Sequence, residues 1–196
     1  SITEGTDITA TLEGTSVTFA TPENFNGSEN FTIAVTDGEL TDSQIITVAV
    51  NAVNDAPVAT TGLAGTGEED QSISILLSGS DVDGDVLTYS ITSSPINGSV
   101  DISGSNATYT PGNNFNGSDS FEFTVSDGTL IDSASVTVSV NAVNDAPVLA
   151  SVSDVSFDED ESGSTSISAS DVDGDSLVYS ITEGTDITAT LEGTSV

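Results

Sequence analysis

The chain of 196 residues contains 32 Asp and Glu residues and no Lys, Arg or His, so its formal charge at pH 7 is −32. This composition excludes binding to nucleic acids and anionic membranes, which needs cationic side chains, and it excludes catalysis by a His base, a Lys Schiff base or an Arg clamp. Cys is also absent, which excludes disulfides, thiolate metal sites and a Cys nucleophile.

The chain is nevertheless apolar enough to fold. Hydrophobic residues make up 35% of it and the mean hydropathy is +0.04, unlike an acidic disordered tail. We therefore expect a folded protein whose carboxylates are held together by bound cations. No initiator Met, membrane-spanning apolar run or signal-peptide pattern is present, so we expect a piece of a longer protein with its targeting information elsewhere.

Apolar and polar residues alternate in short runs, which is the period of a half-buried β-strand. In chain order, the clearest runs are Ile73–Leu77, Leu87–Ile91, Phe121–Val125 and Val136–Val140. Turn-forming pairs separate them, including Asn97-Gly98, Ser103-Gly104, Asn116-Gly117 and Asp127-Gly128. We count six or seven strands in about 90 residues and almost no helix, which predicts an all-β fold of antiparallel Greek-key β-sandwiches, as in Ig-like domains.

The sequence repeats with a period of about 90 residues. Asn51–Val58 recurs unchanged as Asn141–Val148, and Asn24–Val58 matches Asn114–Val148 at 23 of 35 positions. Over a longer distance, Ser1–Val17 is identical to Ser180–Val196. Alternate units are therefore more similar than adjacent ones, as in an array built by duplicating a two-unit block.

Two interpretations of this duplication remain open. The chain is either a window cut from a long array, or the half-unit at the end of one chain is completed by the half-unit at the start of the next. We favour the window, because the duplicated 17 residues would compete for one place in the fold.

The Asn-Asp-Ala-Pro sequence marks the boundary between units, because Pro57 and Pro147 cannot continue a central strand. We predict the C-terminal part of one repeat in residues 1–53, a complete repeat in residues 54–146 and the N-terminal part of the next repeat in residues 147–196. Very short linkers would join these units into a rod.

Acidic residues gather at the same places in each unit. The DVDGD sequences Asp81–Asp85 and Asp171–Asp175 come before a strand, and Glu68–Asp70 and Asp158–Glu161 lie near the start of a unit. Asp37 and Asp127 precede a Gly that follows a strand, and Asp55 and Asp145 lie in the linkers. Alternating Asp residues with a Gly let the backbone curl so that carboxylates converge. Because these acids recur at the same position in each unit, we interpret them as a metal-binding site rather than as ordinary solvated Asp-Gly turns.

Oxygen ligands without nitrogen or sulfur favour Ca²⁺, which accepts an adaptable shell of oxygens, over transition metals and over Mg²⁺. Neither the EF-hand loop nor the glycine-rich nonapeptide of calcium β-rolls is present. The sequence therefore predicts calcium sites of another kind.

In the motifs NAVNDAPV, DVDGD, YSIT, YTPGNNFNGSDSFEFTVSDG and ASVTVSV, essentially the whole chain resembles the bacterial cadherin-like tandem repeats of large secreted (RTX-type) adhesins. The resemblance implies cadherin-like sandwiches in tandem with Ca²⁺ between consecutive domains. Cadherins are similar to this chain in the places that supply their Ca²⁺ ligands. The first domain supplies an acid near its start and an acid from a later loop. The Asn-Asp linker supplies further ligands, and the second domain supplies a DxD motif and a later Asp-Gly.

Carried over by position, the resemblance implies these ligands at the later junction: Glu68 or Glu69, Asp119, Asn144, Asp145, Asp171 and Asp173. At the earlier junction it implies Glu29, Asn54, Asp55, Asp81, Asp83 and Asp127, with the first acidic loop expected before Ser1. Asp85 and Asp175 either bind the ion or cap the turn. The linker differs from that of animal cadherins, and GSDSF, which contains Asp119, replaces their Asp-Arg-Glu signature.

The function expected from these features is that of calcium-rigidified extender repeats of an extracellular adhesin or surface filament. Its partners would be Ca²⁺, neighbouring repeats, and other copies by lateral or head-to-tail association. The alternative is a calcium-dependent carbohydrate-binding or filament-forming module, for which the insertion Thr61–Thr66 is the one candidate loop. Enzymatic activity is not expected, because acids repeated in every unit indicate a scaffold rather than paired catalytic carboxylates.

Overall fold

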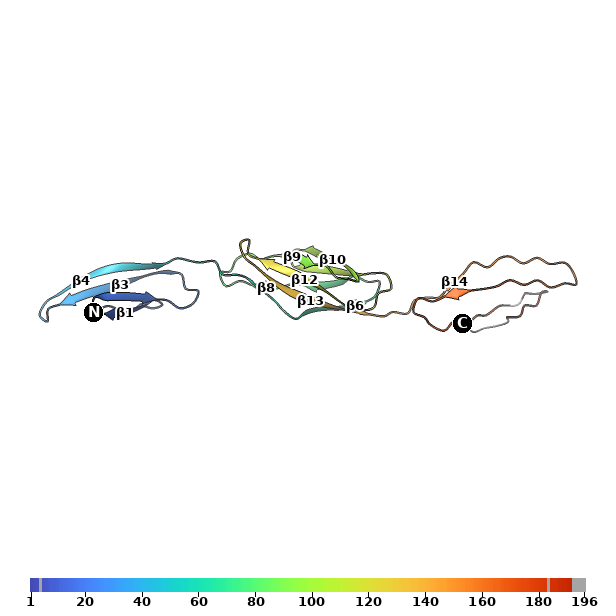
Figure 1. The fold of residues 1–196 in the computed structure, drawn as a ribbon, viewed down its shortest axis with the longest axis horizontal. Helices are drawn as coiled ribbons and strands as arrows, with labels where there is room; N and C mark the ends of the chain where they lie inside the picture. The colour runs from blue at the N-terminus through green and yellow to red at the C-terminus, as the bar shows by residue number, and fades with distance from the viewer. Residues whose placement is uncertain (4, 183, 192–196) are drawn as a thin grey trace. The chain divides into compact units, whose positions relative to one another are not determined.

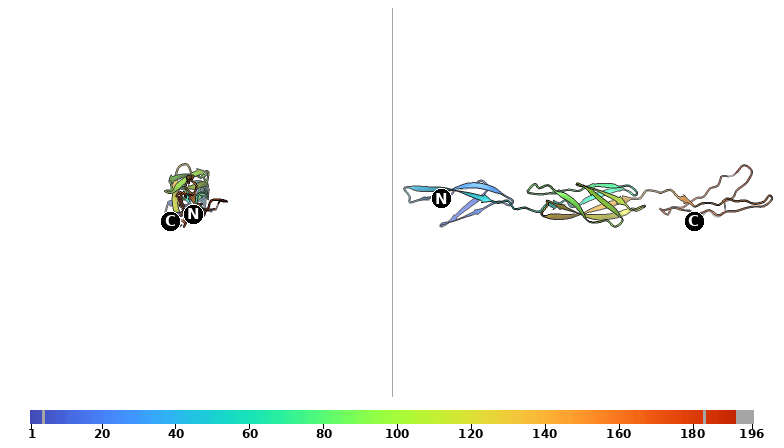
Figure 2. Two further views of the ribbon diagram at one scale, coloured as in Figure 1. Left: turned by 90° about the vertical axis from the view of Figure 1, so that its right-hand side faces the viewer. Right: turned by 90° about the horizontal axis from the view of Figure 1, so that it is seen from above.

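The computed structural model describes residues 1–3, 5–182 and 184–191. These residues form strands, turns and loops (Figures 1 and 2). In the part of the chain that is described there is no helix, and hence none that could span a membrane. The all-β fold class with Ig-like sheets is thereby confirmed.

The first segment, residues 1–53, consists of two antiparallel hairpins. Strand β1 (Thr9–Glu13) pairs with β2 (Ser16–Ala20), and β3 (Gly27–Thr36) pairs with β4 (Thr41–Val50). Gly14 has a φ of 63° between β1 and β2, a conformation in which only a residue without a side chain is free of strain. Ile8 and Phe31 are fully buried, and the ring of Phe19 packs on Phe31.

The middle of the chain forms nine strands. They are β5 (Val58–Ala59), β6 (Leu63–Glu68), β7 (Ile73–Leu76), β8 (Gly79–Ser80), β9 (Thr88–Ser93), β10 (Gly98–Ser103), β11 (Asn106–Pro111), β12 (Gly117–Ser126) and β13 (Ile131–Asn141). The sheets have the orders β6-β13-β12-β9, β10-β11-β7 and β5-β8. Alternate residues of β12 and β13 are buried, as the period of two predicts.

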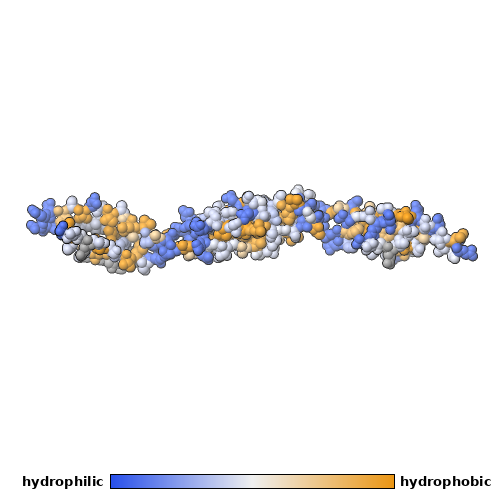
Figure 3. Space-filling view, turned by 180° about the vertical axis from the view of Figure 1, so that it is seen from behind, coloured by the Kyte–Doolittle hydropathy of each residue, from blue (hydrophilic) through white to orange (hydrophobic). Residues whose placement is uncertain are grey.

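The last segment, residues 147–191, contains only one strand pair among its described residues. Strand β14 (Val148–Leu149) pairs antiparallel with β15 (Ala169–Ser170), in the register that β5 and β8 have 90 residues earlier. Hydrophobic residues are visible among hydrophilic ones on the molecular surface (Figure 3).

Two sequence-based expectations need correction. First, β6 and β13 pair in parallel, whereas only antiparallel pairing was predicted. Tight turns force sequential neighbours to be antiparallel, but β6 and β13 are far apart in the chain and are free of that constraint. Second, Thr61–Thr66 is not an inserted loop, because Leu63 already begins β6 and its backbone pairs with Val136 of β13.

The chain is grouped into two compact units. The first comprises Ser1–Thr61, Leu77–Thr92 and Phe123–Ala134, and the second comprises Gly62–Leu76, Ser93–Glu122 and Ser135–Val196. Each unit contains one DVDGD loop and one linker Asp, so each carries one acidic cluster. The division into residues 1–53, 54–146 and 147–196 stays a prediction.

Candidate metal centre

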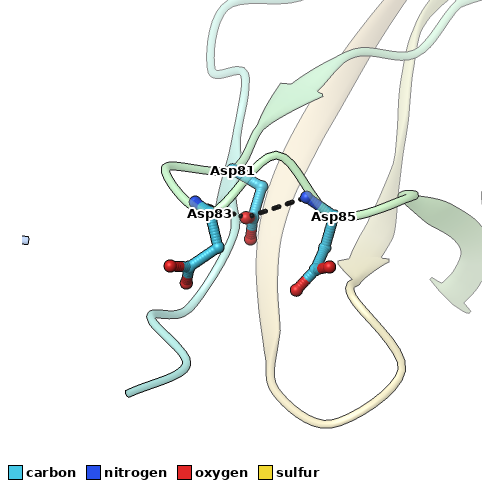
Figure 4. Close-up of side chains that lie close together, drawn as sticks. All are labelled: Asp81, Asp83 and Asp85. Carbon is cyan, nitrogen blue, oxygen red and sulfur yellow. Dashed lines mark hydrogen bonds between the residues drawn. The ribbon is translucent and has the colours of Figure 1, made fainter. Parts of the chain in front are cut away.

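The loop Asp81–Asp85 in the first unit curls its three acids together (Figure 4). The Oδ1 atom of Asp81 accepts hydrogen bonds from the backbone N–H of Asp83 at 2.9 Å and of Asp85 at 3.3 Å. Gly84 has a φ of 81°, which allows the tight turn. One carboxylate oxygen from each Asp lies within 4.8 Å of the others. The turn therefore brings three negative charges to one place.

The linker before β5 is attached to this loop. Asp83 Oδ2 accepts the backbone N–H of Asp55 at 2.8 Å. Asn54 donates its side-chain amide to Asp127 Oδ2 at 2.7 Å. The hydrogen bonds from Asn54 and from the N–H groups of Leu130 and Thr129 hold the pKa of Asp127 below its usual value. One connected set of loops thus contains these residues predicted from the sequence: Asn54, Asp55, Asp81, Asp83, Asp85 and Asp127.

The second unit repeats this arrangement. Asp171 Oδ1 accepts the N–H groups of Asp173 at 3.0 Å and Asp175 at 3.1 Å, and Asp173 Oδ2 accepts the N–H of Asp145 at 2.7 Å. Asn144 donates its side-chain amide to the carbonyl oxygen of Asp145 at 2.9 Å. The same local sequence therefore produces the same hydrogen bonds at both places.

Glu69 is buried beside the second linker and joins it to the loop after β6. Its backbone N–H donates to the carbonyl oxygen of Asn141 at 2.9 Å, and its Oε1 atom accepts the N–H of Val143 at 2.6 Å. Only 3% of the Glu69 surface is exposed, whereas Glu68 is exposed. The sequence left the choice between these two residues open, and the structure turns Glu69 towards the linker.

Asp145 is the centre of the second cluster. Burial raises the pKa of its carboxyl group, and the negative charges of Asp173, Asp70, Glu69 and Asp171 raise it further. Its Oδ2 atom is buried and has no hydrogen-bond partner in the described structure, and the same is true of Asp81 Oδ2. With no Lys, Arg or His in the chain, no basic side chain can compensate these oxygens. All the converging donor atoms are oxygens, a set that fits Ca²⁺.

Asp70 is a member of this cluster that was not predicted as a ligand from the sequence, although it lies in the recurring acidic stretch Glu68–Asp70. Its Oδ1 atom accepts the backbone N–H of Asn114 at 3.1 Å, and its own φ is 58°, a conformation unusual for a residue with a side chain. Asp160 has a φ of 67° at the equivalent position of the next repeat. The pair Glu-Asp occurs at residues 69–70 and again at residues 159–160, and this recurrence is the sequence feature that could have identified Asp70.

Glu29 and Asp119 have another role in the structure. Asp119 accepts the N–H groups of Ile96 and Asn97 and the hydroxyl of Tyr109. Glu29, at the equivalent position, accepts the N–H groups of three successive residues, Thr6, Asp7 and Ile8. Within the described residues, neither carboxylate is hydrogen-bonded to a linker, so both hold a loop of their own repeat in place.

No curated protein matches the chain. The family model of a bacterial Ig domain matches residues 54–141. Among solved structures, a variant of the endo-fucoidan hydrolase MfFcnA4 from glycoside hydrolase family 107 is 26% identical with a TM-score of 0.38; the alignment covers 73% of this chain and 24% of that one. An I-band fragment of titin is 14% identical with a TM-score of 0.29, covering 83% and 66%.

The S-layer protein rSbsC is 19% identical with a TM-score of 0.26, covering 75% of this chain and 25% of that one. This chain thus spans about a quarter of the length of the hydrolase and of the S-layer protein. Residues 54–141, a little less than half of the chain, are thus similar to a bacterial Ig domain.

Proposed function

We propose that the two acidic clusters bind Ca²⁺ and thereby fix each linker to the loops beside it. The observations that carry this proposal are the Asp81–Asp85 loop, in which each of three carboxylates places an oxygen within 4.8 Å of the others, and Asp145, whose Oδ2 atom is buried without a partner in the described structure. The negative charges of Glu69, Asp70, Asp171 and Asp173 raise the pKa of Asp145. Four like charges around a half-buried carboxylate are unfavourable unless a cation compensates them. Bound Ca²⁺ supplies that compensation and accepts oxygen ligands alone.

The predicted ligands fall into two groups under this proposal. At the later linker, Glu69, Asp70, Asp145, Asp171 and Asp173 would hold the ion, with Asn144 and Asp175 shaping the loops around it. At the earlier linker, Asp55, Asp81, Asp83 and Asp85 would do so, with Asn54 and Asp127 orienting the linker. Glu29 and Asp119 are left out, because their oxygens already hold backbone N–H groups.

In this proposal the chain is a structural spacer in an extracellular adhesin or surface filament, and not an enzyme. Extracellular calcium modules bind with a Kd of about 10⁻⁴ to 10⁻³ M, so the linkers would be held in place outside the cell and loose inside it. The match to a bacterial Ig domain and the surplus of acids in the linkers support this role. No observation in the described structure favours the carbohydrate-binding alternative.

Calorimetric titration with CaCl₂ and, separately, MgCl₂ tests the proposal. We expect saturable Ca²⁺ binding with a Kd of about 10⁻⁴ to 10⁻³ M and much weaker Mg²⁺ binding, because Mg²⁺ demands a strict octahedral shell. Glu69→Gln should weaken the Ca²⁺ binding at least several-fold. Glu122→Gln, at an exposed acid of β12, is the matched control and should bind as the parent does. Equal binding of the two metals, or a normal titration of Glu69→Gln, would contradict the proposal.

A further inference from the structure

Asp119 fixes a loop to strand β12. It is buried, whereas Glu122 on the same strand is exposed. Its two carboxylate oxygens accept the backbone N–H groups of Ile96 at 3.1 Å and Asn97 at 2.8 Å, and the hydroxyl of Tyr109 donates to it at 3.0 Å. The position of Asn97, at the start of the β10 hairpin, is therefore set by this carboxylate.

Asn97 in turn holds the connection between β11 and β12. Its carbonyl oxygen accepts the backbone N–H of Gly112 at 2.7 Å, and the carbonyl oxygen of Gly112 accepts the N–H of Phe115 at 3.1 Å. Residues 112–115 thus form a β-turn with Asn114 at its third position. The φ of Asn114 is 56°, and a type II turn requires a positive φ at this position.

This turn contacts the acidic cluster around Asp145. The backbone N–H of Asn114 donates to Asp70 Oδ1 at 3.1 Å. Asp70 follows the buried Glu69, and the negative charges of both residues raise the pKa of Asp145. Asn114 also lines, together with Asp145 and Asp171, an open hollow of about 400 Å³. The turn therefore lies between the loop that Asp119 anchors and the acidic cluster.

The first segment keeps the same anchor with different side chains. Glu29 takes the place of Asp119, and Phe19 takes the place of Tyr109, so no hydroxyl is available there. The longer Glu29 side chain accepts a further backbone N–H instead, that of Ile8 at 3.2 Å. An anchoring carboxylate is thus retained although both side chains have changed.

The contact from the anchored loop to the turn differs between the two places. Pro22 takes the place of Gly112, and Pro has no backbone N–H to donate. The turn itself is retained, because the N–H of Phe25 donates to the carbonyl oxygen of Pro22 at 3.4 Å and Asn24 has a φ of 60°. The turn can therefore form without the hydrogen bond that ties Gly112 to Asn97.

We infer that Asp119 is a positioning residue that acts through the turn Gly112–Phe115 to orient Asp70. Asn97 joins Asp119 to this turn, and the N–H of Asn114 joins the turn to the Asp70 carboxylate. This role rests on the proposed function, in which Asp70 is a ligand of Ca²⁺. Asp119 then affects the affinity for the ion without touching it, because a carboxylate already held in place loses less freedom when the ion binds.

A double-mutant cycle on Ca²⁺ affinity tests this role. An NMR titration that follows the amide signals of residues 143–146 reads this cluster separately from the one at Asp81–Asp85. Residues that orient metal ligands change the affinity by about 10- to 100-fold, and we expect Asp119→Asn to raise the Kd about tenfold. Asp70→Asn should also weaken binding, and adding Asp119→Asn to it should change the Kd little, because one residue acts through the other.

Glu122→Gln is the control for the loss of one negative charge from β12 and should bind Ca²⁺ as the parent does. A double variant in which the two single effects multiply contradicts the inference. So does an effect of Glu122→Gln as large as that of Asp119→Asn, because charge alone would then explain the result.

Substitutions within the turn test the contacts without changing the charge. Gly112→Pro removes the N–H that donates to Asn97, whereas Gly112→Ala keeps it, so the Pro variant should bind Ca²⁺ more weakly than the Ala variant. Asn114→Val disfavours the positive φ of the turn and Asn114→Gly permits it, so the Gly variant should bind more tightly than the Val variant. Equal affinities within both pairs would overturn the inference.

Amide hydrogen exchange in EDTA reads the same contacts without the metal. Relative to the amides of β13, which report global unfolding, the Asn114 N–H should exchange faster in Asp119→Asn and in Gly112→Pro than in the parent. Unchanged exchange in both variants contradicts the positioning role. If exchange changes as expected but the parent binds no Ca²⁺, the positioning of Asp70 stands and the proposed function fails. If the parent and Asp119→Asn bind Ca²⁺ with the same Kd, the proposed function stands and the inference fails.

Discussion

At the scale of single residues, two Asp side chains have pKa values that are shifted in opposite directions. Burial favours the neutral form of Asp119, but the N–H groups of Asn97, Ile96 and Ser120 and the hydroxyl of Tyr109 outweigh it, and its pKa is lowered. The pKa of Asp145 is raised, because its half-buried carboxyl group loses hydration and is surrounded by the negative charges of other carboxylates. Asp119 is thus stabilised by donors, whereas the proposed function assigns the compensation of Asp145 to Ca²⁺.

We predict that Asp119→Ala destabilises the chain by about 1 to 3 kcal/mol for each buried donor left without a partner. Because the folded-state pKa is below the ordinary value of 3.8, the contribution of Asp119 is complete above pH 3.8 and is lost as the pH falls through the folded-state pKa. Thermal melts from pH 7 to pH 2 should show the difference between variant and parent shrinking in acid. Asp101→Ala, at an exposed acid of β10, is the matched control for the loss of one carboxylate.

Tyr109 reports on the same contact. Burial and the neighbouring Asp119 carboxylate raise the pKa of its hydroxyl to about 12. The folded state therefore holds this proton more tightly than the unfolded state, and the resulting stability is present below pH 10 and is lost as the pH rises towards 12. Absorbance titration of the phenol should find one Tyr that ionises near pH 12 in the parent and at lower pH in Asp119→Ala.

Asp145→Asn should have effects of opposite sign in two buffers. In EDTA the variant should melt at a higher temperature than the parent, because a repelled and partly unpaired carboxylate has become neutral. In CaCl₂ it should lose most of the stabilisation that calcium gives the parent. The raised pKa implies that acidification from neutral pH also relieves this repulsion in the parent without Ca²⁺. An Asp145→Asn variant that is less stable than the parent in EDTA would refute the unfavourable environment assigned to this residue.

At the scale of secondary-structure elements, β6 packs on β7 with small residues of β6 facing large side chains of β7. A Cβ atom on Gly65 would lie 2.6 Å from two carbons of Ile75, and one on Gly67 would lie 2.5 Å from Ile73. In the next repeat the order is reversed: Val155 and Phe157 replace the glycines, and Gly163 and Thr165 replace the isoleucines. A Cβ atom on Gly163 would lie 2.6 Å from Val155. Each repeat thus fills the same space from the opposite side.

A double-mutant cycle tests this exchange. Gly65→Val alone should destabilise the chain by about 1 to 3 kcal/mol through overpacking, and Ile75→Thr alone by a similar amount through a cavity and a buried hydroxyl. The double variant should lose less unfolding free energy than the two single variants lose together, as expected for residues in contact. Thr66→Val, at an exposed position of β6, is the control for added volume. Strict additivity in urea unfolding would show that the two positions do not share this space.

At the scale of the whole molecule, the net charge of −32 dominates the response to solution conditions. Salt at about 0.1 M screens charges more than about 10 Å apart, so NaCl should stabilise the chain modestly. Ca²⁺ bound only to the folded state adds a specific gain: at about 10 mM Ca²⁺ and a Kd of about 10⁻⁴ to 10⁻³ M, this is about 1.4 to 2.7 kcal/mol per site.

Thermal melts in about 10 mM CaCl₂ and in NaCl of the same ionic strength separate these two effects. We expect the larger shift in CaCl₂ and its full reversal by EDTA. Equal shifts in the two salts would mean that Ca²⁺ acts only by screening, and the proposed sites would then have to be abandoned.

The sequence by itself determined the strand-rich fold, the 90-residue period and the local DVDGD turns. The strands and turns depend on residues close together in the chain, as in the hydrogen bonds from Asp83 and Asp85 to Asp81, and the period can be read directly from the sequence. It also identified Asp55, Asp145, Asp171 and Asp173 as members of recurring acidic clusters. It could not choose between Glu68 and Glu69, and it did not predict Asp70 as a ligand.

Only the tertiary structure decided contacts between distant parts of the chain. The parallel pairing of β6 with β13, the burial of Glu69 beside Val143 and the use of Asp119 to hold Tyr109 all join residues that are not neighbours in sequence. Glu68 and Glu69 differ by one position in a strand end, so the face that is packed determines which carboxylate is buried. The sequence therefore determined where negative charge recurs, and the packing decided which carboxylates face a linker and which hold a loop.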